Sequence, residues 1–411
     1  MTVSTDRSNR FLGGPAVPPA DGSPHASGRP VGNWAFLGLT VTSLGGPLAL
    51  AALNAPQLAG DASASAGFAM LAAAAVFLAP LVIWVKYARH ATGSGGLYTF
   101  VERAAGRRVA LVQAAVWAFS YALYLIYTTV AIVYDTLPQV LPGVRPYRPL
   151  LEIAIPVALA IVMLAGRAVT LLVVGVLAAG QLALVAALDV VTLAHSAPTA
   201  ASFGARAPAG ALATASAGTA LLYICGSLPL FLGAELARPA RTVSRMLPLG
   251  YLLAVLGIVL AVFPLSSNPA FMSAPIPGMS VAQVFAGHGL AVAIGVGVAA
   301  STAGVMLVEY LALSRLLTAV TAWHRRRIVA GLGLTLVAAA PVSLINPDRF
   351  YNDLLKPSLG ALWVSQAIVF AVYPRFAVRH GSGRIPAYAL AGIATALCVY
   401  GLWNTLHSPT T

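Results

Sequence analysis

Long hydrophobic segments recur along the whole chain, separated by short polar stretches. Eleven of them have about the 18 residues that an α-helix needs to cross a bilayer. The pattern therefore predicts eleven transmembrane helices in one embedded domain. They lie at residues 33–55, 66–88, 109–137, 149–166, 169–195, 213–236, 246–265, 288–320, 328–345, 356–374 and 385–405.

Two of these segments are interrupted in their middle by glycine and proline. Residues 43–47 read SLGGP, and residues 225–229 read CGSLP. Glycine weakens a helix through backbone entropy, and proline removes an N–H group and clashes with the preceding turn. A broken helix in hydrocarbon exposes polar backbone groups that need partners. A pair of such breaks, one in each half of the chain, is typical of a transporter's binding site.

Composition agrees with a polytopic membrane protein. Of the 411 residues, 59% are hydrophobic and 9% are charged, whereas soluble domains are about a quarter charged. The net charge of +13 would suggest nucleic acid as a partner of a soluble protein. Here the connecting loops hold the positive charge, so membrane orientation explains it and we expect no nucleic-acid partner.

The distribution of Lys and Arg predicts the orientation. With the N-terminus inside, all but five of the 24 Lys and Arg residues fall on the cytoplasmic side, as the positive-inside rule requires. The C-terminus is then outside, and we expect a multi-pass protein of the cytoplasmic (inner) membrane. Residues 1–30 are rich in Pro, Gly, Ser and Ala and are expected to form a disordered cytoplasmic tail.

No constellation of catalytic residues stands out. The seven histidines are scattered, the two cysteines lie in apolar segments without metal-ligand spacing, and there is no phosphate-binding loop of the Walker type. We therefore expect neither an enzyme nor a bound metal or organic cofactor.

Three motifs resemble the amino acid–polyamine–organocation superfamily of permeases. Residues 93–108 read GSGGLYTFVERAAGRR, similar to the family's Gly-Gly-x-Tyr-x-(Tyr/Phe)-Val segment after the second helix. Residues 233–245 read GAELARPARTVSR, which looks like the family's acidic and proline-containing stretch after helix 6. Ser314 and Arg315 resemble the Ser-Arg pair at the inner end of helix 8.

The resemblance implies an all-α polytopic fold of the leucine-transporter type. Two inverted five-helix repeats, at about residues 33–195 and 213–375, would form a transporter core over residues 31–375. Helices 1 and 6 would unwind at the midplane, where the two breaks fall. Residues 376–411 would add one further transmembrane helix and a short tail.

At the first break, backbone N–H groups near Ser43, Gly45 and Gly46 are candidates for holding a substrate carboxylate. A half-helix that begins there presents its positive dipole end, and glycine allows close approach. The alternative is that these are small residues at which helices pack closely.

At the second break the candidates are Tyr223, Cys225, Gly226 and Ser227, where freed carbonyls could accept a substrate ammonium group. The resemblance places a glutamate of the family at the position of Ser227, so the departure leaves the substrate's charge open. The family also places aromatic side chains of helix 3 against the substrate, and Tyr124 is the mid-span candidate here.

Three residues of the eighth segment are candidates for ion binding or coupling. The resemblance implies that Ser301 and Thr302 could join carbonyls of helix 1 around Na⁺, while the alternative is that both hydroxyls bond to the preceding turn. Glu309 is either a proton carrier or a buried partner of Arg315. Glu235 is expected to pair with Arg238 near an inner gate.

Together these patterns predict a secondary active transporter for an amino acid or a related small amine, either H⁺-coupled or exchanging. The competing hypotheses are a Na⁺-coupled amino acid symporter and a non-transporting sensor or subunit that kept the fold. The expected partners are a small-molecule substrate and the lipid bilayer, and the oligomeric state stays open.

Overall fold

The computed structural model describes residues 30–196, 199–321 and 323–407. The predicted tail, apart from Pro30, lies outside these residues. The residues from Val31 onward belong to a single unit, and the fold is described for this unit alone.

The predicted number of spans is confirmed. Among the described residues, eleven helical stretches are long and apolar enough to cross a membrane, and each overlaps one predicted segment. They are Asn33–Leu58, Gly60–His90, Arg107–Val140, Pro142–Leu164, Arg167–His195, Ala209–Glu235, Pro239–Ser267, His288–Val320, Arg325–Ser343, Pro347–Arg379 and Arg384–His407.

The α-helices that make up these spans and their connections are listed here in chain order. They are α1 (Asn33–Ser43), α2 (Pro47–Ala49), α3 (Ala55–Leu58), α4 (Ala66–His90), α5 (Leu97–Ala105), α6 (Arg107–Val130), α7 (Leu137–Val140), α8 (Arg148–Leu164), α9 (Arg167–His195), α10 (Ala209–Leu222), α11 (Pro239–Val262), α12 (Pro277–Phe285), α13 (His288–Val320), α14 (Arg325–Ser343), α15 (Pro347–Arg379) and α16 (Arg384–His407).

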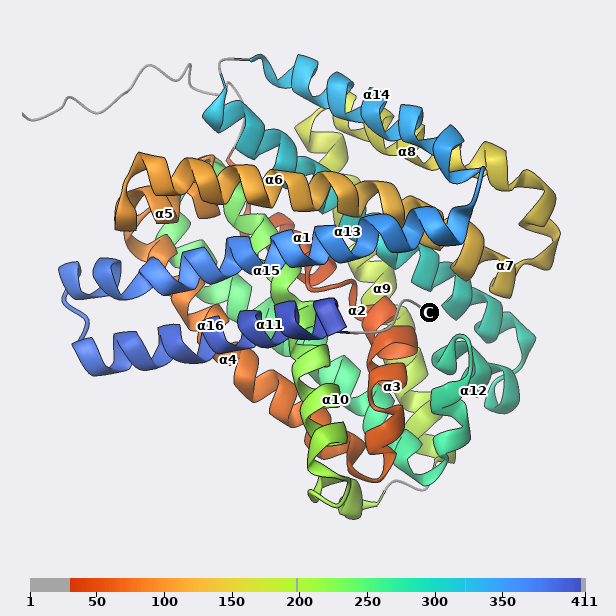
Figure 1. Ribbon diagram of the computed structural model, residues 1–411. Helices are drawn as coiled ribbons and strands as arrows, with labels where there is room; N and C mark the ends of the chain where they lie inside the picture. The colour runs from red at the N-terminus through yellow and green to blue at the C-terminus, as the bar shows by residue number, and fades with distance from the viewer. Residues whose placement is uncertain (1–29, 197–198, 322, 408–411) are drawn as a thin grey trace, which may run out of the picture. The chain divides into compact units, whose positions relative to one another are not determined.

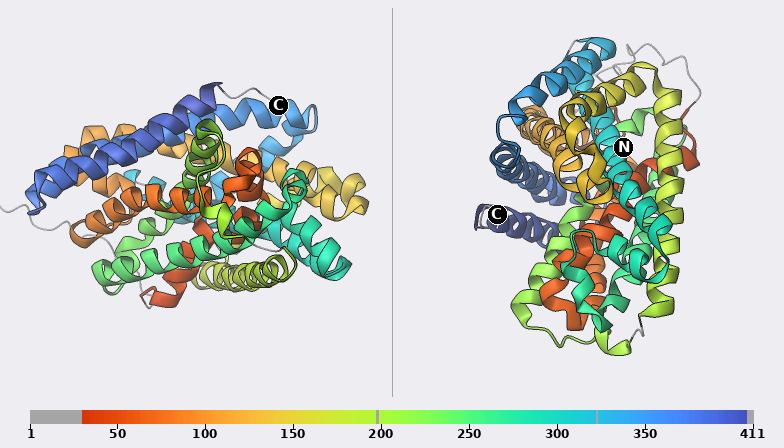
Figure 2. Two further views of the ribbon diagram at one scale, coloured as in Figure 1. Left: turned by 90° about the horizontal axis from the view of Figure 1, so that it is seen from below. Right: turned by 90° about the vertical axis from the view of Figure 1, so that its right-hand side faces the viewer.

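Of the two interrupted spans, α1 and α2 lie near the middle of the view in Figure 1, and α3 and α10 extend toward its lower edge. The apolar windows of the two interrupted spans are 83% and 78% buried, against 22% for the span that contains α8. Helices α8 and α14 pack side by side at one edge, and α16 runs along α15 (Figures 1 and 2). The interrupted spans therefore lie where protein rather than lipid surrounds the irregular backbone, as a membrane fold requires.

The first interruption opens the helix as the sequence predicts. Helix α1 ends at Ser43, and Gly45 and Gly46 take φ values of 75° and 67°. These left-handed conformations strain any residue with a Cβ atom. Pro47 then starts the next helical stretch, where its missing N–H group costs nothing.

The second interruption differs from the prediction. Helix α10 continues without a gap into a 3₁₀ helix over Tyr223–Glu235, and this stretch includes Pro229. A 3₁₀ helix closes its hydrogen bonds over three residues and rarely runs beyond four. The α-helix therefore ends at the predicted interruption, but the chain does not open as it does after α1, because the two glycines and the one proline of this segment are accommodated in a tighter helix.

The glycine-rich motif after the second span begins a short helix that the hydrophobic pattern alone did not predict. Gly96 has φ 52° and immediately precedes α5. A Cβ atom at Gly96 would lie 2.5 Å from the ring of Phe231 in the 3₁₀ stretch. The motif therefore lets α5 begin directly against the second interrupted span.

The break in α1 leads to a stability prediction. A Cβ atom at Gly46 would lie 2.3 Å from Ser301 Oγ, and the left-handed backbone adds strain. We expect Gly46→Ala to destabilise the protein by about 1–3 kcal/mol, seen as a lower thermal denaturation midpoint in detergent. Gly331→Ala in α14 is the matched control, because no heavy atom lies within 4 Å of its Cβ position. Equal midpoints for the two variants would contradict the account of the break.

Candidate functional site

The two interrupted spans touch each other at the centre of the bundle. A Cβ atom at Gly226 would lie 2.6 Å from Leu44 Cδ2 and 3.7 Å from the indole of Trp84. The side chain of Leu44 therefore covers Gly226 in this conformation. A ligand that binds between the two breaks would have to displace it.

The backbone at the first break is largely engaged within its own span. The N–H of Gly45 donates to Ser43 O at 2.7 Å, and the N–H of Gly46 donates to Thr42 O at 3.2 Å. The Ser43 hydroxyl donates to Thr40 O at 2.9 Å. The three residues predicted to offer free N–H groups therefore need a rearrangement before they can bind a carboxylate.

Ser301 of α13 forms hydrogen bonds both to α2, which follows the break, and to α9. Its hydroxyl accepts a hydrogen bond from the Ala49 N–H at 3.3 Å and donates one to Gln181 Oε1 of α9 at 2.7 Å. Thr302 instead donates to Val298 O, one turn earlier in α13, at 3.0 Å. The hydroxyl pair thus splits: Ser301 faces the break, whereas Thr302 bonds to its own helix.

A chain of three buried polar side chains joins spans 3, 6 and 8. The Tyr121 hydroxyl donates to Cys225 Sγ at 3.7 Å, and the Cys225 thiol donates to Glu309 Oε1 at 3.7 Å. Glu309 is fully buried, and Tyr121 and Cys225 are 1% and 7% exposed. The second carboxyl oxygen of Glu309 has no hydrogen-bond partner among the described residues.

The predicted pairing of Glu309 with Arg315 is wrong. Arg315 contacts Glu235 instead. Residues six positions apart on an α-helix point about a third of a turn away from each other. Glu309 therefore faces the central spans while Arg315 faces the end of the bundle, and no cation offsets the charge of Glu309 among the described ion pairs.

Three tyrosines of span 3 form a column of aromatic rings that begins at Tyr121, the first member of this chain, and continues to Tyr351. Tyr121 lies 6.1 Å from Tyr124 between ring centroids, Tyr124 lies 5.1 Å from Tyr127, and Tyr127 lies 5.4 Å from Tyr351 of α15. The column ends at a hollow that Tyr351 lines together with Asp135 and Asp348. Tyr124, the predicted aromatic contact, lies one turn beyond Tyr121, which makes the direct contact with Cys225.

Two other candidates of the second break face different neighbours. Tyr223 packs against Phe77 and Tyr251, each at 5.5 Å between ring centroids, in a cluster with α4 and α11. Ser227 donates to Ile224 O and accepts a hydrogen bond from Gln366 Nε2 of α15 at 3.3 Å. Of the four, Cys225 and Gly226 are the residues that the structure brings to the first break and to Glu309.

An ion-pair cluster joins the C-terminal end of span 6 to the start of span 5 and to the C-terminal part of span 8. Glu235 binds Arg167 at 3.0 Å and also Arg315, and its side chain is 9% exposed. The backbone of Glu235 additionally accepts a hydrogen bond from the Val31 N–H at 2.9 Å. The predicted pairing of Glu235 with Arg238 is therefore wrong, although a gate-region ion pair is present.

Sequence reasoning overlooked two polar groups in these spans. Glu152 is 1% exposed in α8, and Gln181 is 3% exposed in α9. Glu152 could have been found, because it is the one acidic residue in an otherwise apolar segment at 149–166. Gln181 carries no such signal, since an uncharged amide in an apolar helix has many packing roles.

The buried cluster around Glu235 leads to a second stability prediction. Removing the carboxylate charge leaves two partly buried guanidinium groups without compensation. We expect Glu235→Gln to cost about 3–5 kcal/mol, measured as the loss of thermal stability in detergent. Asp353→Asn is the control, because Arg349 and Asp353 pair at 3.5 Å on the surface, with side chains 79% and 67% exposed, and should contribute about 0–1 kcal/mol. If Glu235→Gln lowers thermal stability no more than Asp353→Asn does, the ion pairs of Glu235 do not stabilise the protein as the structure predicts.

Comparison with known proteins shows similarity at the level of the fold. No protein-family model and no curated protein match the sequence. The crystal structure of MhsT in complex with L-phenylalanine matches over 92% of this chain and 98% of that chain, with 14% identity and a TM-score of 0.64. A Na⁺-coupled sialic acid symporter, in a substrate-bound outward-open state, matches over 92% and 90%, with 12% identity and a TM-score of 0.55.

A manganese transporter of Eremococcus coleocola, in complex with an aromatic bis-isothiourea compound, is also similar. It matches over 91% of this chain and 87% of that chain, with 10% identity and a TM-score of 0.59. At these identities the likeness concerns the fold alone. The chain is a multi-pass, all-α membrane protein with the leucine-transporter-like fold, as the interrupted helices and the motifs predicted.

Proposed function

We propose that this protein is a secondary active transporter that moves an amino acid or a related small amine by alternating access. The fold similarity to three transporters supports a transport role. The superfamily motifs at residues 93–108 and 233–245 support an amino acid or amine over the sialic acid and manganese named for two of the neighbours. The proposed location is the cytoplasmic membrane, with the N-terminus inside.

The observation that carries the proposal is the Tyr121–Cys225–Glu309 chain next to the break in α1. A carboxyl group buried in a membrane protein without a cationic partner is costly, and such groups usually serve a function. A substrate ammonium group would supply the missing charge at Glu309 Oε2. The helical stretch that follows Gly46 presents its positive end on the other side of the site, where a carboxylate would be favoured.

The described conformation is closed on the side of the Glu235 cluster. Transport in the proposed cycle requires two changes. Leu44 leaves Gly226 so that the substrate can lie between the interrupted spans, and the ion pairs of Glu235 with Arg167 and Arg315 then separate to open the other side. The 3₁₀ stretch ends at Glu235, so a change in its winding at the substrate would move this gate directly.

We propose coupling to H⁺, or exchange, ahead of coupling to Na⁺. The Ser301 hydroxyl already bonds to Ala49 and Gln181, and Thr302 bonds to its own helix. An ion bound between α1 and α13 would have to replace the Gln181 bond. A Na⁺-coupled symporter is therefore the second candidate, and a non-transporting sensor the third.

The binding proposal predicts ligand-dependent stabilisation. A ligand that binds only the folded state raises its apparent stability by an amount that grows with the logarithm of ligand concentration over Kd. We expect at least one amino acid or small amine, at millimolar concentration, to raise the thermal denaturation midpoint of the purified protein without Na⁺. Glu309→Gln should abolish the rise. If no amino acid or amine shifts the midpoint, the assignment fails, and a rise that requires Na⁺ would favour the second candidate.

Cys225 offers a direct measure of where the ligand binds. The described residues contain two cysteines, both buried. We expect a membrane-permeant thiol reagent to modify Cys225 slowly in the Cys398→Ala variant, because the site opens only transiently. The stabilising ligand should slow this modification at least several-fold. In the reciprocal Cys225→Ala variant, the ligand should leave the labelling of Cys398 unchanged, and equal protection at both positions would place the ligand elsewhere.

A further inference from the structure

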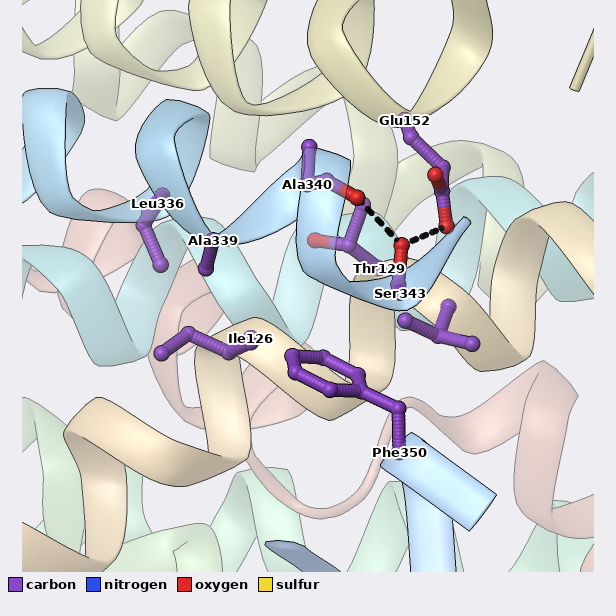
Figure 3. Close-up of a pocket in the computed structure, with 9 residues that line it drawn as sticks. Ile126, Thr129, Glu152, Leu336, Ala339, Ala340, Ser343 and Phe350 are labelled. Carbon is purple, nitrogen blue, oxygen red and sulfur yellow. Dashed lines mark hydrogen bonds between the residues drawn. The ribbon is translucent and has the colours of Figure 1, made fainter. Parts of the chain in front are cut away.

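A second buried carboxyl group lies apart from the central site, between α6, α8 and α14 (Figure 3). Glu152 of α8 is 1% exposed and lines a small cavity with Thr129 of α6, Ser343 of α14 and Phe350 of α15. The cavity has a volume of about 10 Å³, about the minimum for one water molecule. Its remaining lining residues are apolar or small.

The Ser343 hydroxyl makes two short contacts with oxygen atoms, but it has only one hydrogen to donate. The Ser343 hydroxyl oxygen lies 2.6 Å from Glu152 Oε1 and 2.5 Å from Ala340 O, and Figure 3 shows both contacts. A serine hydroxyl has one hydrogen to donate, and a carbonyl oxygen can only accept. If Ser343 donates to Ala340, the contact with Glu152 needs a hydrogen from the carboxyl group itself.

Among the ion pairs of the described residues, none involves Glu152. The cavity's lining residues on α6, α14 and α15 include no titratable side chain. The neighbouring titratable groups are Tyr134 and Arg148, and the Arg148 guanidinium is engaged by Tyr134, with a bond to its backbone oxygen at 3.3 Å and a cation–π contact at 4.9 Å. The second oxygen of Glu152 has no hydrogen-bond partner among the described residues.

From this geometry we infer that Glu152 is a proton-binding site that joins α8 to α14 when it is protonated. The protonated carboxyl donates to Ser343, and Ser343 donates to Ala340 O, so each contact has its hydrogen. Release of the proton leaves a carboxylate that can accept from Ser343 only if Ser343 gives up Ala340. Proton binding and release therefore reverse the direction of the Glu152–Ser343 hydrogen bond between α8 and α14, and they make or break the Ser343–Ala340 bond within α14.

Two residues that line the Glu152 cavity also line wider hollows nearby. Phe350 lines the Glu152 cavity and also a wider hollow next to Arg349 and Asp353. Val130 lines the same cavity and the hollow that contains Asp135 and Asp348. Phe350 and Val130 thus each lie between the Glu152 cavity and a hollow that polar side chains also line.

The proton site is tested by infrared spectroscopy of the full-length protein in lipid. At neutral pH, the difference spectrum between the wild type and Glu152→Gln should contain the carbonyl band of one protonated carboxylic acid. Ser343→Ala should shift this band in the wild-type background and shift nothing in the Glu152→Gln background. Asp189→Asn is the matched control, since Asp189 is another buried intramembrane acid, 8% exposed, and its own signal should be insensitive to Ser343→Ala.

A carboxylate signal in place of the protonated band would overturn the inference. If Glu152→Gln does not fold, the inference is tested with Ser343→Ala alone. If this substitution shifts no carboxylic-acid carbonyl band, the proposed hydrogen bond between Glu152 and Ser343 is contradicted. These spectra do not depend on substrate, so they stand even if the protein transports nothing.

The coupling role of the site rests on the proposed transport function. We expect Glu152→Gln to reduce accumulation driven by a pH gradient at least tenfold while leaving substrate exchange within about twofold of the wild type. Asp189→Asn should retain both activities. Undiminished proton-driven accumulation in Glu152→Gln, together with the infrared band, would restrict the proton to a structural role and overturn the coupling.

Discussion

The structure depends on how the broken backbone of α1 is satisfied inside a membrane protein. In hydrocarbon, an unpaired N–H or carbonyl group costs several kcal/mol, so a helix opens only where other groups take over its hydrogen bonds. Here Thr42 O and Ser43 O receive the N–H groups of the two glycines, and Ser301 receives that of Ala49. Ser301 is itself oriented by Gln181, so one hydroxyl ties three spans together at the break.

In the second interrupted span, the backbone hydrogen bonds are satisfied in another way, and this difference bears on the proposed function. Its backbone stays helical but is wound as a 3₁₀ helix from Tyr223 to Glu235. A helix with 2.0 Å rise per residue is longer and less stable than an α-helix of equal sequence, so changes in its winding move its end. That end is Glu235, the centre of the closed ion-pair cluster, while Cys225 near its start contacts Glu309. The proposed substrate site and the proposed gate therefore lie toward the two ends of one 3₁₀ stretch.

The sequence predicted the fold because hydrophobic length and the position of Gly and Pro are local properties. Eleven spans, their order and the opening at Gly45 and Gly46 followed from them directly. The partners of polar side chains did not, since they depend on helix faces and on packing between distant segments. Glu235 binds Arg167, 68 positions away, rather than its near neighbour Arg238. The face of Glu309 could have been foreseen, because six positions along a helix exclude a contact on the same face with Arg315.

Neither the 3₁₀ winding of the second interrupted span nor the contact of Glu152 could be predicted from local sequence patterns, for different reasons. Gly226 and Pro229 are compatible with an open loop or with a tightened helix, and the sequence around them does not distinguish the two. The proposed role of Glu152 depends on its short contact with Ser343, 191 positions later, and no local pattern around either residue predicts that contact.

The central claim, transport of an amino acid or small amine without Na⁺, is tested most directly in proteoliposomes. The measurement is the accumulation of a radiolabelled ligand, chosen as one that stabilises the purified protein, under an imposed pH gradient or a Na⁺ gradient, and its exchange against internal ligand. The account predicts exchange, or accumulation driven by the pH gradient, that does not change when Na⁺ is replaced by choline. Accumulation that requires the Na⁺ gradient, or no flux of any bound ligand, would contradict it.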